Sequence, residues 1–309
     1  MVIREGNTMR NTILYGDCRD TLKQFDEQAR TCITSPPYYG LRDYGGEENQ
    51  IGQENTPEEF IDQLVSVFKE VRNVLTDDGT LWINLGDSYY NYRPGKGQSY
   101  PKQSVSKTNQ DLPTQCNKRG NKLEGLKEKD LIGIPWMFAF AMRSDGWYLR
   151  QDIIWHKPNP MPESVKDRCT KSHEYIFLLS KNKKYYYDNE AIKEPVKQDW
   201  GTRDRTKGKY HNTGSGLSPH SGLSKSYERK NKRDVWSVTN KPFKGSHFAV
   251  FPPDLITPCI LAGSEKGDII LDPFMGSGTT AMVAKHLGRD YIGCELHKEY
   301  GNLIDQRVP

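Results

Sequence analysis

Two consecutive prolines give residues 34–38 a shape that could hold a reacting group. The segment reads Thr34-Ser35-Pro36-Pro37-Tyr38. Both prolines fix φ at about −65° and lack a backbone donor, and the first also keeps Ser35 out of the helical region. We therefore expect a stiff, extended diproline hook (residues 34–38) that fixes the Ser35 hydroxyl, the nearby carbonyls and the Tyr38 ring. A segment of this kind could hold an amino group that is attached to a flat ring. Pro-Pro-Tyr also occurs in plain loops and in peptides that bind small domains, which is the alternative.

A glycine-rich segment near the other end of the chain, the glycine loop (residues 272–280), could bind a nucleotide. It follows the aliphatic run 269–271, which predicts a buried parallel strand. Gly276 and Gly278 permit a tight turn in which backbone approaches a ligand closely. A predicted helix over 279–286 and a strand over 291–294, ending at Glu295, complete a βαβ nucleotide-binding unit. The acid is then placed to accept hydrogen bonds from ribose hydroxyls.

Two other interpretations of the glycine loop stay open. Gly276-x-Gly278-x-x-Ala281 also fits the dinucleotide fingerprint, so a nicotinamide oxidoreductase would explain this half of the chain. A glycine turn that binds no ligand is the other possibility. The oxidoreductase would leave the diproline hook unexplained.

The rest of the pattern must supply the elements that position these two segments. A threonine cap, a proline and a glutamate at Thr56, Pro57 and Glu59 predict a helix start, and apolar residues then recur at helical spacing as far as Leu75. Further helices are predicted over 19–25 and 129–142, and strands from residue 12 and over 31–34, 80–85, 148–155 and 175–179. Strands that alternate with helices indicate an α/β fold with a mostly parallel sheet.

Two polar stretches interrupt this alternation. Residues 91–121 are rich in Gly, Ser, Asn, Gln, Lys and Pro, and an insert of that kind is expected to be functional or disordered. Residues 187–244 carry many Lys and Arg side chains interleaved with Trp and Tyr. That composition suits contacts to phosphates and bases, and a solvated loop is the alternative.

Composition restricts the class of protein. The chain has 309 residues, 35% of them hydrophobic, and a net charge of only +4, so any basic surface must be local. It has no apolar run of about 18 residues and no apolar stretch typical of a secretion signal, so we expect neither a membrane span nor export. Six scattered cysteines without metal-like spacing indicate free thiols, a cytoplasmic location and no metal site.

Taken together, the two motifs resemble the DNA methyltransferases that modify exocyclic amino groups. The diproline hook is similar to that family's catalytic Ser/Asp/Asn-Pro-Pro-Tyr/Phe motif, and residues 272–279 to its donor-binding loop. The catalytic motif precedes the donor motif, which is the permuted order of the β group. Segments 16–18, 86–88 and 155–159 are also similar to that group, so the resemblance covers nearly the whole chain.

The resemblance implies a Rossmann-like methyltransferase fold with a mostly parallel seven-stranded sheet, a circularly permuted motif order and a small irregular target-recognition region. The expected division is a catalytic part over 1–164, with the polar insert at about 91–121, a target-recognition region over 165–245, and a cofactor-binding part over 246–309.

The resemblance also implies S-adenosyl-L-methionine as cofactor and double-stranded DNA as partner. A cognate restriction endonuclease is a possible second partner, and the chain would act as a monomer or homodimer. The catalytic residues would be Ser35, Pro36, Pro37 and Tyr38. The cofactor-binding residues would be Asp17, Thr34, Phe248, Phe251, Asp272, Pro273, Phe274, Gly276, Ser277, Gly278, Thr279 and Glu295.

Several functional details remain open at this point. Asp17 could simply cap the following helix, and Cys259, although it follows a proline, is expected to be a core thiol inside a helix. Serine before Pro-Pro favours N4 methylation of a flipped cytosine within the family, with N6-adenine as the alternative. An RNA or protein amine methyltransferase and a catalytically silent DNA-binding module are the more distant alternatives.

Overall fold

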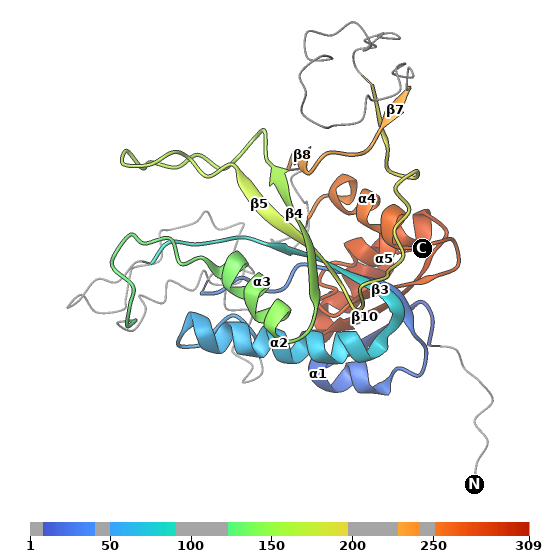
Figure 1. Ribbon diagram of the computed structural model, residues 1–309. Helices are drawn as coiled ribbons and strands as arrows, with labels where there is room; N and C mark the ends of the chain where they lie inside the picture. Colours follow the sequence, from blue (N-terminus) through green and yellow to red (C-terminus); the bar gives the residue numbers. More distant parts are fainter. Residues whose placement is uncertain (1–8, 41–49, 91–122, 197–227, 241–250, 309) are drawn as a thin grey trace, which may run out of the picture. The chain divides into compact units, whose positions relative to one another are not determined.

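The computed structural model describes residues 9–40, 50–90, 123–196, 228–240 and 251–308 (Figure 1). The chain forms two compact units, one of residues 1–187 with 234–309 and one of residues 188–233. The predicted insert at 91–121 and Phe248 lie outside the described residues.

The larger unit is built on one sheet in the order β1-β10-β9-β2-β3-β5-β4-β8. Neighbours from β1 to β3 are parallel, β5 is antiparallel to both β3 and β4, and β8 is parallel to β4. The strands are β1 (Thr12–Tyr15), β2 (Ala29–Thr34), β3 (Leu75–Leu85), β4 (Tyr148–His156), β5 (His173–Ser180), β8 (Val235–Ser237), β9 (Ile269–Asp272) and β10 (Asp290–Glu295).

This architecture confirms the predicted α/β, mostly parallel fold, with one correction to the strand count. The described part of the sheet has eight strands where seven were expected. The extra strand is β8, whose Trp236 pairs with Trp155 of β4. The reason is local: Val235 to Ser237 form a short apolar-aromatic run at the end of the basic stretch, and this run satisfies the open edge of β4.

Helices cover both faces of the sheet. The helices α1 (Cys18–Thr21), α2 (Pro57–Val74) and α3 (Ile134–Ser144) pack on one face, and α4 (Pro253–Gly263) and α5 (Thr279–His286) on the other (Figure 1). Alternation along the strands explains this, because Cys32 and Leu81 join the core with α2, whereas Trp82 lies against Gly263 of α4. Both faces of the parallel strands are therefore apolar, as in other doubly covered sheets.

The long helix α2 follows its sequence signals. The Thr56 hydroxyl accepts a hydrogen bond from the Glu59 amide at 3.1 Å, and Pro57 occupies the first turn. The apolar stripe is buried: Phe60, Ile61, Leu64, Val67, Phe68, Val71 and Val74. The core of the larger unit is thus anchored by a helix whose start is specified locally.

Removing the Thr56 cap is expected to destabilise the fold. Thr56→Ala leaves the Glu59 amide without its side-chain partner, and losing such a cap costs about 1 kcal/mol. Urea unfolding should show that loss in the free energy of unfolding. An unchanged unfolding midpoint would contradict the assigned capping role.

Two predicted helices differ from the observed ones. The helix predicted over 129–142 begins only at Ile134, because Lys129 and Gly133 adopt positive φ values of 76° and 89°. Asp87 Oδ1 accepts hydrogen bonds from the amides of Gly133 (3.0 Å) and Ile134 (3.1 Å) and so fixes that start. The helix predicted over 19–25 is shorter: α1 is followed by a 3₁₀ turn, η1 (Leu22–Gln24).

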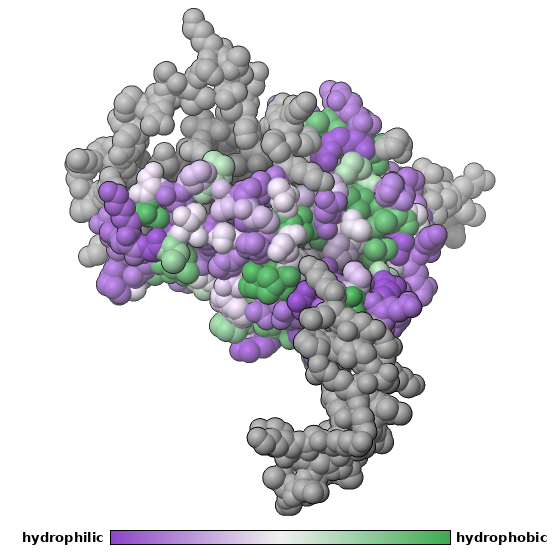
Figure 2. Space-filling view, turned by 90° about the horizontal axis from the view of Figure 1, so that it is seen from above, coloured by the Kyte–Doolittle hydropathy of each residue, from purple (hydrophilic) through white to green (hydrophobic). Residues whose placement is uncertain are grey.

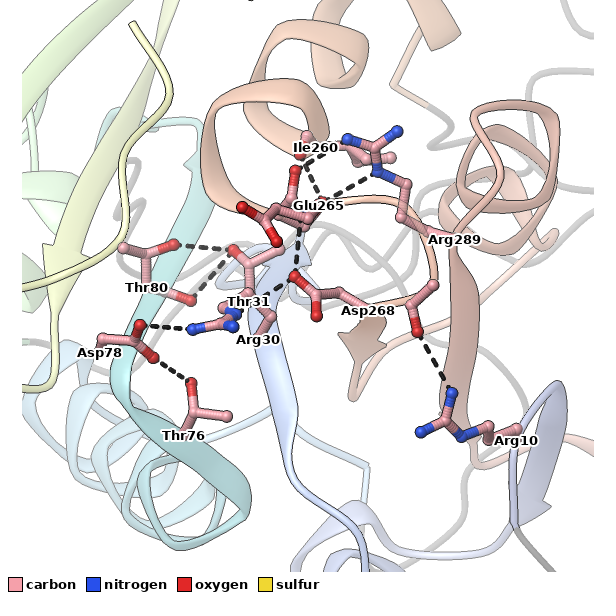
Figure 3. A network of polar contacts seen from close by, with 12 residues as sticks. Arg10, Arg30, Thr31, Thr76, Asp78, Thr80, Ile260, Glu265, Asp268 and Arg289 are labelled. Atoms are coloured by element: carbon pink, nitrogen blue, oxygen red, sulfur yellow. Dashed lines mark hydrogen bonds and ion pairs between the residues drawn. The ribbon is translucent and has the colours of Figure 1, made fainter.

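A polar network fastens the amino ends of the parallel strands (Figure 3). Arg30 of β2 forms ion pairs with Asp78 of β3 and, at 3.2 Å, with Asp268 just before β9. The Thr31 and Thr80 hydroxyls, 2.9 Å apart, add a buried contact between β2 and β3. These contacts link the strands at their amino ends. The carboxyl ends of the same strands take no part in this network.

The smaller unit, residues 188–233, contains one short antiparallel pair, β6 (Glu194–Pro195) with β7 (Arg229–Lys230). Glu194 forms ion pairs with Lys232 at 3.5 Å and Arg233 at 3.3 Å. The smaller unit covers fewer residues than the predicted region 165–245. The strands β5 and β8 fall inside that range and belong to the main sheet. A recognition role for this unit stays a prediction.

The face of the molecule seen in Figure 2 is mostly polar where residues are described. On the face shown in Figure 2, hydrophobic residues form separate small patches among hydrophilic ones. Within the described ranges, every helix is too short or too polar to span a membrane.

Candidate active site

The diproline hook and the glycine loop meet at the carboxyl ends of two adjacent strands. β2 leads into the hook and β9 into the loop, and the two strands are hydrogen-bonded neighbours. The Thr34 hydroxyl donates to Asp272 Oδ1 at 2.6 Å, although the two residues are 238 positions apart. The chain continues from β9 to β10 on one side and from β2 to β3 on the other. This is the switch point of the sheet, where α/β proteins bind their ligands.

Asp272 links the two motifs from inside the protein. Its side chain is 1% exposed and accepts hydrogen bonds from the hydroxyls of Thr34 and Thr280, both at 2.6 Å, and from the Phe274 amide at 3.0 Å. Burial raises the pKa of the Asp272 carboxyl to about 6, although these donors favour the ionised form. The carboxylate thus joins the diproline hook to the glycine loop, and its direct contact with a cofactor stays a prediction.

The glycine loop presents backbone at this place. Gly276 and Gly278 have φ values of 53° and 79°, which other residues rarely adopt. The neighbouring side chains of Ser277 and Thr279 are buried. They accept hydrogen bonds from Arg307 of the helix α6 (Gly301–Arg307). Arg307 of α6 therefore supports the loop through these two side chains, and a cofactor contact by Ser277 and Thr279 stays a prediction.

Glu295, at the end of β10, shapes the loop and keeps acceptor capacity. Its Oε2 accepts from the Gly276 amide at 2.7 Å and its Oε1 from the His297 amide at 3.0 Å. Burial raises the pKa of this carboxyl above its ordinary value. An ionised carboxylate has about four lone-pair sites, so Glu295 can accept hydrogen bonds beyond these two. Two neighbouring hydroxyls of a ribose fit that capacity.

Asp17 lies at the end of β1 and has a structural partner. It is the N-cap of α1, and its Oδ1 accepts hydrogen bonds from Arg19 N and Nε, each at 2.9 Å. Burial raises the pKa of Asp17, but the Arg19 bonds outweigh it and the net pKa is lowered. The cap at Asp17 is therefore present, and whether the same carboxylate also contacts a ligand stays a prediction.

The side chains of the diproline hook are held by groups that the sequence did not single out. Tyr38 Oη lies 2.8 Å from Glu174 Oε2 and 3.2 Å from Asn84 Oδ1, and Ser35 Oγ lies 3.5 Å from the same amide oxygen. Glu174 in turn forms an ion pair with Lys157. Asn84 is on β3, Glu174 on β5, and Lys157 follows β4, so three strands converge on the hook.

Gly86 leaves room for the Tyr38 ring. A Cβ atom at position 86 would lie 2.6 Å from Tyr38 Cε2 and 3.3 Å from Cζ. No side chain fits there without displacing the ring. The glycine of the segment 86–88 thus has a steric reason that involves the hook directly.

The other predicted residues have less defined positions. Phe251 precedes α4 and is half-buried, and Phe274 packs against the core cluster. Cys259 is buried within α4, as expected for a core thiol. In the described part of the chain, no cluster of three or more His, Cys, Asp or Glu side chains could hold a metal ion.

Comparison with known proteins identifies the family to which the chain belongs. A model of the N6/N4 methyltransferase family, described as DNA methylase, matches residues 29–306. The chain belongs to this family. The β-group resemblance is thereby confirmed, and the glycine loop is that of a DNA methyltransferase instead of a nicotinamide enzyme.

Sequence relatives of this methylase cover almost all of it. It is 45% identical to the type II methyltransferase M.SmaI of Serratia marcescens over 98% of the chain and 92% of the relative. It is 46% identical to M.Cfr9I of Citrobacter freundii, over 96% of the chain and 87% of that protein. The methylase is thus similar throughout to modification enzymes of type II restriction-modification systems.

Solved structures confirm the Rossmann-like methyltransferase fold. The cytosine-N4-specific PvuII DNA methyltransferase matches with a TM-score of 0.62 and 19% identity, over 98% of this chain and 87% of that one. A DNA modification methylase of Thermus thermophilus, solved with S-adenosyl-L-methionine, matches with a TM-score of 0.59 and 23% identity, over 96% and 94%.

The buried Asp272 is expected to make stability depend on pH. Its pKa is about 6 in the folded chain against an ordinary 3.8, so the folded state binds the proton more tightly. Its contribution to the free energy of unfolding is then complete below about pH 4 and declines as pH rises to about 6, by about 3 kcal/mol in all. Asp272→Asn cannot titrate at this position, so the free energy of unfolding of wild type should fall by that amount relative to the variant between pH 4 and pH 7 in urea unfolding. A difference that stays constant with pH would contradict this.

Proposed function

We propose that this methyltransferase transfers a methyl group from S-adenosyl-L-methionine to the exocyclic N4 amine of a flipped cytosine in double-stranded DNA. It would serve as the modification half of a restriction-modification pair. The observation that carries the proposal is the 2.6 Å bond from Thr34 to Asp272, which joins the diproline hook to the glycine loop at the switch point.

The cofactor fits the groups at the glycine loop. The backbone of residues 274–278 would hold its amino acid portion, and the remaining acceptor sites of Glu295 would take the ribose hydroxyls. Asp17 would accept the adenine amine. When bound, S-adenosyl-L-methionine supplies the methyl group for the transfer. That a Thermus thermophilus methylase of the same fold was solved with this molecule supports the assignment.

The diproline hook would prepare the amine that accepts the methyl group. A base amine is a poor nucleophile because its lone pair is delocalised into the ring. The Ser35 hydroxyl and the Pro36 carbonyl can accept its hydrogens and favour a more tetrahedral nitrogen, and Pro37 keeps both acceptors in place. Much of the rate would then come from orientation of the two reactants.

The target base must leave the duplex to reach this site. Flipping costs a few kcal/mol, and stacking on an aromatic ring returns ~1–3 kcal/mol per base. Tyr38 is the ring at the hook for that contact. Residues 165–245 would form the target-recognition region, and their described basic side chains, such as Arg229 and Lys230, suit the phosphate contacts that position a protein on the duplex.

Two features favour cytosine over adenine. The residue before Pro-Pro is a neutral serine instead of a carboxylate, and the PvuII methyltransferase of the same fold is cytosine-N4-specific. N6-adenine is the second candidate, because both bases present a similar edge around the amine. An RNA or protein amine is the more distant candidate.

Sequencing of DNA from a methylation-free bacterial host that expresses this chain tests the proposal. The method must distinguish N4-methylcytosine from N6-methyladenine. We expect N4-methylcytosine within one short recurring sequence. N6-methyladenine would establish the second candidate, and unmodified DNA from a host with folded enzyme would overturn the proposal.

A further inference from the structure

We infer that Glu174, held by Lys157, is a positioning residue that sets both the Ser35 hydroxyl and the Tyr38 ring for methyl transfer. The inference rests on the proposed function of the diproline hook. It concerns side chains on β3, β5 and the end of β4, none of which belongs to the hook or to the glycine loop.

Counting protons gives each bond in this cluster a direction. The Tyr38 hydroxyl has one proton, and among the described residues two acceptors lie within reach, Glu174 Oε2 at 2.8 Å and Asn84 Oδ1 at 3.2 Å. The carboxylate is nearer and charged, so the proton is donated to Glu174. Asn84 Oδ1 is then left for the Ser35 hydroxyl, 3.5 Å away.

The orientation of Asn84 also depends on Glu174. Asn84 Nδ2 donates to Glu174 Oε2 at 3.2 Å and to the Tyr175 carbonyl at 3.1 Å. These two acceptors turn the amide oxygen toward the hook. When Ser35 donates its proton to that oxygen, the lone pairs of its hydroxyl are directed elsewhere and can accept a hydrogen from a substrate amine.

Lys157 makes the buried carboxylate tolerable. Lys157 Nζ and Glu174 Oε1 form an ion pair, and the two side chains are only 16% and 15% exposed. The ring of Trp155 lies 4.1 Å from the same ammonium and limits its motion. Removing the lysine alone would leave an unpaired, mostly buried charge, which is costly.

Gly86 completes the arrangement from the side of the ring. Its missing side chain lets Tyr38 lie against the β3 end while Glu174 holds the hydroxyl. The ring is therefore fixed at two points, one steric and one charged. A base that stacks on it meets a surface already in place, which lowers the ordering cost of binding.

Glu174→Gln is the decisive variant. It keeps the shape but removes the charge, and the new amide NH2 must face either the Lys157 ammonium or the Asn84 NH2, both of which are donors. We expect kcat for duplex DNA to fall by about tenfold to hundredfold, as for loss of a hydrogen bond to a charged group, while KM for S-adenosyl-L-methionine is unchanged. The matched control is Glu27→Gln, which removes a carboxylate paired with Arg10 at 2.8 Å. Glu27 lies before the amino end of β2, so this variant should leave kcat unchanged.

Two further comparisons separate positioning from a general loss of structure. In a double-mutant cycle, Glu174→Gln should cost much less kcat in a Tyr38→Phe background, because the shared bond is already absent. Lys157→Met should be worse than the double variant Lys157→Met with Glu174→Gln, because the second change removes the unpaired charge.

The outcomes also separate this inference from the proposed function. Wild-type kcat in Glu174→Gln, or strictly additive effects with Tyr38→Phe, would overturn the positioning role while transfer to DNA stands. A folded wild-type enzyme that methylates no duplex DNA would overturn the proposed function and the inference together.

Discussion

Replacing Ser35 with alanine is expected to reduce methyl transfer to duplex DNA by at least about 100-fold. The hydroxyl would accept a hydrogen of the reacting amine, and removal of one hydrogen-bonding group aimed at a transition state typically costs 10²- to 10³-fold in kcat. Binding of S-adenosylhomocysteine, measured by calorimetry, should remain at the wild-type level, because Thr34 and Asp272 keep the loop in place.

The matched control for Ser35→Ala is Ser66→Ala. Ser66 also loses a hydroxyl that is hydrogen-bonded in the protein, to the Gln63 carbonyl at 2.6 Å, but it lies on α2 away from the hook. We expect full activity in that variant. Equal, measurable activities of Ser35→Ala and wild type would exclude the Ser35 hydroxyl from the chemistry, and no activity in either protein would favour a catalytically silent DNA-binding module.

Replacing Gly278 with alanine is expected to weaken binding of S-adenosyl-L-methionine by about tenfold or more. Gly278 has a φ of 79°, and its Cβ would lie 3.1 Å from Ile304 of α6. The left-handed conformation costs about 1–2 kcal/mol for other residues, and the loop can escape it only by changing the backbone that meets the ligand. At ~1.4 kcal/mol per tenfold, this strain corresponds to the expected loss of affinity.

Gly267→Ala separates backbone strain from an effect on the site. Gly267 has a similar φ of 84°, no atom of the described residues lies within 4 Å of its Cβ position, and it precedes β9 at the amino end of that strand. Both alanine variants should lose stability in urea unfolding, and only Gly278→Ala should lose cofactor affinity. An equal loss of affinity in both would show that the glycine loop has no special role.

The fold and the two motifs could be predicted because their signals are local. Thr56 and Pro57 specify the start of α2, and Gly276 and Gly278 specify a turn after β9. The predicted start of α3 at residue 129 was wrong. The observed start at Ile134 is fixed by the carboxylate of Asp87, which is distant in sequence. Local spacing gives no information on such a partner.

The support of the diproline hook was missed for a related reason. Glu174 and Asn84 come together only because β5 runs antiparallel beside β3 in a register that pairs Asn84 with Ile176. That register depends on long-range strand order, which the alternation of apolar residues does not reveal. Arg307 is a similar case, since its contact with the glycine loop arises from the packing of the last helix.

The central claim is that the diproline hook and the glycine loop form one site for methyl transfer to a base amine. The most direct measurement incubates the purified chain with methyl-labelled S-adenosyl-L-methionine and duplex DNA, digests the DNA to nucleosides and separates them by chromatography. We expect label in N4-methyldeoxycytidine with the wild-type chain, and we expect this label to be lost with Ser35→Ala. Label in 5-methyldeoxycytidine, or label that is undiminished in Ser35→Ala, would contradict it.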